Sequence, residues 1–91
     1  MLTLPIKKKW FDMILSREKK EEYREIKPYY TSRFKNMESC LVKFRNGYSL
    51  SSPYIICAVH IKKGTGKQEW GAEPNKNYYV LEIKCIVTWK C

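Results

Sequence analysis

The chain has 91 residues, enough for one domain, and its 44% hydrophobic content can supply a packed core. Its 18 lysine and arginine residues outnumber its 9 acidic residues, giving a net charge of +9 that attracts polyanions. No stretch is long and apolar enough to cross a membrane as a helix. We therefore expect one domain over residues 1–91 that does not bind membranes.

The cysteines indicate free thiols. Cys40, Cys57, Cys85 and Cys91 form no CxxC pair, and His60 is the single histidine. Structural zinc sites usually take two ligands from one tight turn, so we expect neither a metal nor another cofactor. No secretory signal segment appears, which predicts a reducing, cytoplasmic setting.

The first part of the chain predicts a strand, a helix and a second strand. Residues 1–5 form a short apolar strand that ends at a proline. Apolar residues at helical spacing predict a helix over residues 7–16, with Trp10 facing the core. A polar connection then leads to a strand over residues 21–26. A competing interpretation extends the helix through the Glu/Lys run to Tyr23, because these residues favour helices.

The remainder predicts mostly strands. Residues 27–38 form a linker with one helical turn, and the Asn46-Gly47 pair is a strong hairpin signal. We expect strands over residues 40–45, 54–62 and 78–87, with a long loop over residues 64–77. The predicted fold class is therefore α+β, a small barrel of about five strands with one N-terminal helix and a short helical turn.

The segment REKKEEYR, residues 17–24, carries the most specific pattern. If residues 21–26 are extended, Glu22 and Arg24 share one face and Lys19 lies at the entrance to the strand. Arg24 offers five planar donors, which suit a phosphate or a base edge. Glu22 can accept a hydrogen bond from an amino group. The three side chains could therefore converge on one ligand.

This segment resembles the ASCH signature G-x-K-x-x-E-x-R, with Arg17 in place of the glycine. The Leu-Pro strand, the helix WFDMIL and the last strand YYVLEIKCI fit as well, so the resemblance spans most of the chain and favours a strand over residues 21–26. It implies a PUA-like barrel in which Lys19, Glu22 and Arg24 line a cleft between barrel and helix. It also implies a nucleic-acid or nucleotide ligand, and Arg17 could narrow that cleft.

The resemblance also implies an enzymatic alternative. Some small ASCH proteins hydrolyse acetylated cytidine with the motif lysine and a distant glutamate, others cleave RNA, and others only bind. Arg17 and Lys20 flank Lys19, and like charges lower the pKa of a lysine, which suits a base or nucleophile. The distant acid would be Glu69 or Glu73. A threonine can replace the motif glutamate in those amidohydrolases, so Glu22 weighs against this alternative.

Aromatic and basic residues outside the segment suggest further contacts. Tyr29, Tyr30, Phe34 and Trp70 lie near cations and could stack on bases or pack in the core. The basic loop of residues 62–67 lacks the full Walker pattern but could touch phosphates.

Three functions remain open. The first is binding of RNA or a modified nucleoside, with these ligand residues: Lys19, Glu22, Arg24, Arg17, Trp70 and Glu69. The second is a small hydrolase with Lys19, Glu22 and Glu73 as catalytic residues. The third is a protein-interaction domain with a basic surface.

Overall fold

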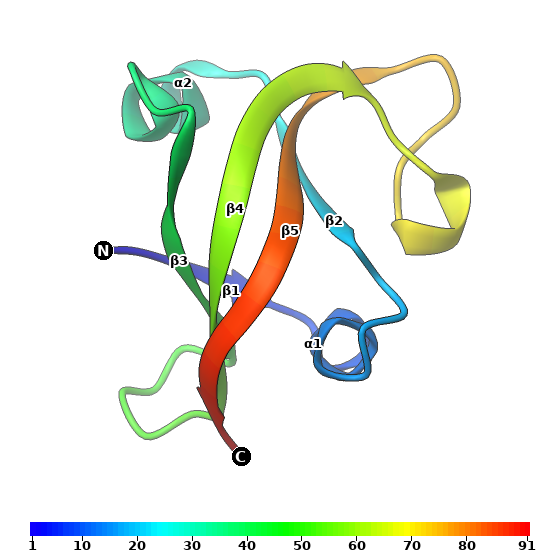
Figure 1. Ribbon diagram of the computed structural model, residues 1–91. Helices are drawn as coiled ribbons and strands as arrows, with labels where there is room; N and C mark the ends of the chain where they lie inside the picture. The colour runs from blue at the N-terminus through cyan, green and yellow to red at the C-terminus, as the bar shows by residue number, and fades with distance from the viewer.

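Five strands form one mixed sheet that curls into a half-barrel, accompanied by two helices (Figure 1). The computed structural model describes all 91 residues. The elements are β1 (Leu2–Ile6), α1 (Lys8–Leu15), β2 (Glu21–Glu25), α2 (Pro28–Phe34), β3 (Ser39–Asn46), β4 (Tyr54–Thr65), the 3-10 turn η1 (Gln68–Trp70) and β5 (Asn77–Lys90). None of the helices is long and apolar enough to span a membrane.

The strand order is β1-β3-β4-β5-β2, so the first two strands of the chain form the two edges of the sheet. β1 runs parallel to β3, and every other pairing is antiparallel. The long β4–β5 pair contains irregularities at Ile56/Cys57 and Ala58/Val59. Such bulges bend strands and increase their twist, which is consistent with the curled shape in Figure 1.

Alternation along the strands builds the core. Ile55, Cys57, Val59 and Ile61 of β4 are all buried, at the two-residue spacing that places side chains on one face. The amphipathic helix α1 adds Phe11 and Ile14 to the same cluster. The apolar face of α1 therefore packs against the core of the half-barrel.

Most of the predicted elements are confirmed. α1 ends at Leu15, so the competing interpretation of one helix reaching Tyr23 is wrong. The predicted helical turn in residues 27–38 is a seven-residue helix that starts with a proline in its first turn, where the missing N–H costs nothing. β4 and β5 run beyond their predicted ends because they pair with each other from Tyr54↔Lys90 to Thr65↔Asn77.

Arg17 ends the first helix in a left-handed conformation, with φ of 68°. Its backbone N–H donates to the carbonyl of Ile14, and the N–H of Lys19 donates to the carbonyl of Met13. Carbonyls at the end of the helix thus gain partners. Left-handed backbone favours glycine, which is the residue of the ASCH signature at this position. Glycine would therefore adopt the backbone conformation of residue 17 with less strain than arginine.

Replacing Arg17 with glycine should therefore stabilise the protein. We expect Arg17→Gly to raise the free energy of unfolding by about 0.5–1 kcal/mol, the relief of left-handed strain less the extra flexibility of glycine in the unfolded chain. Arg17→Ala removes the same charge but keeps the strain, so it should give no such gain. Urea denaturation measures both, and equal effects of the two variants would contradict the conformational explanation.

The four thiols should differ in reactivity. Burial raises the pKa of the Cys57 thiol to about 12 and also raises the pKa of the half-buried Cys40, whereas Cys85 and Cys91 are exposed. Because the thiolate is the reactive form, we expect two fast thiols, one slower thiol and one that reacts only on unfolding. Thiol titration of the single Cys→Ser variants assigns the phases; rapid reaction of Cys57 would contradict the packing of β4.

Candidate functional site

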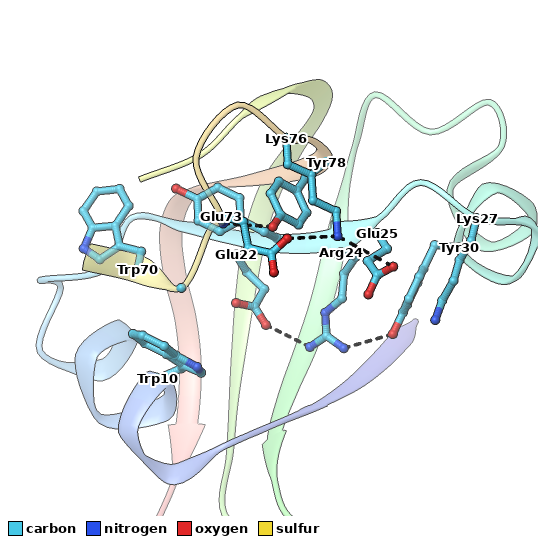
Figure 2. Close-up of a pocket in the computed structure, with 12 residues that line it drawn as sticks. Trp10, Glu22, Arg24, Glu25, Lys27, Tyr30, Trp70, Glu73, Lys76 and Tyr78 are labelled. Atoms are coloured by element: carbon cyan, nitrogen blue, oxygen red, sulfur yellow. Dashed lines mark hydrogen bonds and ion pairs between the residues drawn. The ribbon is translucent and has the colours of Figure 1, made fainter. Parts of the chain in front are cut away.

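A cavity of about 370 Å³ opens between α1, β2, α2 and the segment from η1 to the start of β5. Figure 2 shows Glu22 and Arg24 at its centre, Trp10 and Trp70 toward one end, and Tyr30 with Lys27 toward the other. Its volume lies in the range of small-ligand sites. The cavity therefore has room for a ligand of the size of a nucleobase.

Glu22 is the centre of a buried network of charges. Its side chain is only 9% exposed; Oε1 lies 3.2 Å from Lys19 Nζ and Oε2 lies 2.8 Å from Arg24 Nη2. Glu22 and Arg24 share a face because β2 is extended, as the sequence predicts. The predicted trio Lys19, Glu22 and Arg24 is thus brought together.

Lys19 does not line this cavity; it lies at a separate, smaller recess together with Arg17. Its side chain is fully buried, and Nζ donates to the backbone carbonyl of Trp70 at 2.7 Å. The rings of Trp10 and Tyr23 lie 4.8 and 5.0 Å from the same nitrogen. The amine thus has protein partners on several sides and is shielded from solvent.

The pKa of Lys19 is lowered, in the direction predicted from the sequence, but for a different reason. Burial is the main cause, the nearby Arg24 adds to it, and the ion pair with Glu22 opposes it. Arg17 and Lys20, the neighbours expected from the sequence to lower this pKa, are not among its causes. A buried amine with a lowered pKa is a structural group here rather than an accessible nucleophile.

Arg24 is largely occupied with holding the fold together. Nη2 donates to the carbonyl of Pro5 at 2.9 Å as well as to Glu22, and Nη1 donates to the hydroxyl of Tyr30 at 3.2 Å. Nε is buried without a partner. Through these bonds Arg24 connects β2 to β1 and α2, across the seam where the two edge strands are not paired.

The charges that line the cavity are balanced. Its cations are Arg24, Lys27 and Lys76, and its acids are Glu22, Glu25 and Glu73. Lys76 Nζ lies 3.4 Å from a carboxylate oxygen of Glu73 and 4.0 Å from one of Glu25. A polyphosphate would find no excess of cations in this cavity, whereas a neutral polar ligand would find both donors and acceptors.

Aromatic side chains form much of the wall. Trp10, Tyr30, Trp70 and Tyr78 all line the cavity. Trp10 is half-buried and packs against the main core cluster, so the prediction of a core role describes only one of its two faces. Gly71 lies so close that an added Cβ would be 3.0 Å from the ring of Trp10. No sequence pattern indicates that this turn and α1 meet.

The remaining predicted residues are dispersed. Glu73 lines the cavity with a side chain that is 71% exposed, whereas Glu69 lines no cavity. Arg17 lies at a separate recess of about 80 Å³ beside Lys20 and Lys84, so it does not narrow the main cavity. The structure therefore does not support Arg17 and Glu69 as contacts of one shared ligand.

The aromatic residues predicted to contact a ligand occupy three kinds of position. Tyr30 and Trp70 line the cavity, Phe34 is buried in the core, and Tyr29 is exposed with Arg33 over its ring. Several lining residues belong to no sequence motif and were not predicted as ligand contacts, among them Lys27, Lys76 and Tyr78. No group of three or more His, Cys, Asp and Glu side chains is arranged to hold a metal ion.

Comparison with protein-family models finds no match, and no curated protein or solved structure matches the chain.

The buried network predicts a strong thermodynamic coupling. Lys19→Met and Glu22→Gln should each lower the free energy of unfolding by about 3 kcal/mol, because each removes an ion-pair partner from a buried charge. The double variant should cost less than the sum of the two, with a coupling energy above about 1 kcal/mol. Urea denaturation of all four proteins measures the cycle.

The exposed Lys8–Asp12 ion pair provides the matched control. It joins residues four apart on α1 at 2.6 Å, and exposed pairs contribute little. Lys8→Met should therefore leave the free energy of unfolding nearly unchanged. Strict additivity of the Lys19 and Glu22 substitutions would contradict the buried network.

Proposed function

We propose that this chain is a nucleic-acid-binding domain of the ASCH type, within the PUA-like superfamily, whose cavity receives a nucleobase of RNA or a modified nucleoside. The α+β half-barrel, the helix between its first two strands and the segment from Arg17 to Arg24 at the cavity support this family proposal.

One observation carries the functional proposal: aromatic walls surround a charge-balanced cavity that offers fixed hydrogen-bonding groups. Aromatic faces stack on bases of any sequence. A base is a flat, neutral ligand with donors and acceptors on its edges, so it needs no excess of cations. The 3:3 balance of cations and acids in the lining favours the base over the phosphate as the group inside the cavity.

Glu22 gives the cavity its chemical preference. A carboxylate can accept about four hydrogen bonds, two on each oxygen. Lys19 occupies one of these positions on Oε1 and Arg24 occupies one on Oε2. The remaining positions suit an exocyclic amino group. We therefore infer that the cavity prefers cytosine, adenine or guanine over uracil, which has no amino group.

Binding is favoured over hydrolysis by the position of Lys19. A catalytic amine must reach the substrate, and Nζ of Lys19 is enclosed by Glu22 and the carbonyl of Trp70. Glu73, the distant acid of the enzymatic alternative, is paired with Lys76 at the rim. The function proposed here is therefore recognition.

Surface charge supports a strand of nucleic acid as the natural ligand. The lining of the cavity is neutral overall and the chain carries +9, so the excess positive charge lies outside the cavity. Cations outside the base site are suited to phosphates, which position a strand without selecting its sequence.

A nucleoside titration tests the base preference. Cytidine should bind about tenfold more tightly than uridine, the difference expected for one hydrogen bond to a charged group. Glu22→Gln should reduce this ratio toward one, because an amide offers an N–H where the amino group needs an acceptor. Tryptophan fluorescence reports binding through Trp10 and Trp70. The ratio does not depend on the fraction of folded protein, so lower stability of the variant does not affect it.

Lys63→Ala is the control, since Lys63 is exposed and lines no cavity. It should leave the cytidine:uridine ratio unchanged and weaken single-stranded RNA equally for all sequences. A basic surface without a base site would behave otherwise: Glu22→Gln would bind RNA more tightly, and cytidine and uridine would be equivalent. That result would overturn the proposal.

A further inference from the structure

The cavity continues beyond the Glu22–Arg24 ion pair. A second cavity, of about 270 Å³, shares Trp10, Glu22 and Arg24 with the first. Its other wall comes from Pro5, Ile6, Lys7 and Tyr48. The two cavities lie along the seam between the edge strands β1 and β2, and the three shared residues separate them. Together they form one groove with two compartments.

Tyr48 is the most exposed aromatic residue of this protein. It is 89% exposed, and no other ring and no cation lies against its own ring. The ring of Tyr48 is therefore available to a ligand.

The loop that carries Tyr48 is held in place by its own hydrogen bonds. The N–H of Asn46 donates to the carbonyl of Pro53 at 2.9 Å, and the N–H of Ser52 donates to the carbonyl of Ser49 at 3.0 Å. Gly47 takes a φ of 121°, which favours glycine, and an added Cβ would be 2.8 Å from the Ser52 hydroxyl. The backbone beneath the exposed ring is thus fixed without any packing of the ring itself.

Lys7 makes this end of the groove positive. It is exposed and has no ion pair. Glu22 and Arg24 cancel, so Lys7 supplies the net charge of the second cavity. An unpaired cation beside an open aromatic ring is the combination that binds a nucleotide in a single strand, through its phosphate and its base.

We propose that Tyr48 and Lys7 form a second subsite, in which Tyr48 stacks on the base next to the one held in the first cavity and Lys7 contacts the phosphate that joins them. The ligand is then a single strand of at least two nucleotides. This inference rests on the proposed function, because it assumes that the first cavity holds a base.

Nucleoside and dinucleotide probes test the second subsite. Three kinds of probe are titrated by tryptophan fluorescence: cytidine, the dinucleotide CpC, and CpC analogues in which one base is replaced by hydrogen. The abasic position is placed at the 5′ end in one analogue and at the 3′ end in the other. CpC should bind about tenfold more tightly than either abasic analogue, as expected for stacking one base on an aromatic ring. Tyr48→Ala should abolish this difference and leave cytidine binding unchanged.

Tyr29→Ala is the matched control, since Tyr29 is also an exposed tyrosine but lines neither cavity. It should retain the tenfold difference. If CpC and the abasic analogues bind equally, or if Tyr48→Ala retains the difference, the second subsite is wrong while cytidine binding still supports the first. If none of the probes binds, the base site itself is wrong, and the second subsite falls with it.

Discussion

The buried chain of charges Lys19–Glu22–Arg24 holds together parts of this protein that the sheet does not connect. A curled sheet whose edge strands are unpaired has an open seam, and Arg24 crosses it by donating to Pro5 of β1. Lys19 attaches the η1 turn through the carbonyl of Trp70. Buried charges are tolerated only when their hydrogen bonds are largely satisfied. The positions of β1, β2 and η1 are therefore set together, and so is the shape of the groove between them.

The residues that hold the seam are also the residues that a ligand would meet. Glu22 and Arg24 line both cavities, and their mutual ion pair fixes the directions in which each can still bond. Because their positions are set by the fold, a ligand would not have to order them on binding. Under the proposed function, a change to the trio would therefore alter both stability and ligand recognition, and a measurement of affinity alone would not separate the two roles.

The sequence predicts the elements better than it predicts the site. Two-residue alternation in β4 and helical spacing in α1 reflect burial, which is a local pattern. The partners of the trio are different, because they are backbone carbonyls at Pro5 and Trp70, 19 and 51 residues away from their donors. Every residue carries such a carbonyl, so side-chain identity cannot reveal the contact. Lys76 and Tyr78 are equally hard to predict, because the course of the loop between η1 and β5 brings them to the cavity.

The net charge of the chain does not by itself indicate which ligand the chain would select. A field of +9 acts on every phosphate alike and raises the affinity for any strand. It cannot distinguish one base from another, because bases are neutral. Discrimination has to come from groups that are fixed, partly dehydrated and balanced in charge, as Glu22 and Arg24 are. Under the proposed function, strength and selectivity of binding therefore come from different sets of residues, the first spread over the surface and the second confined to the seam.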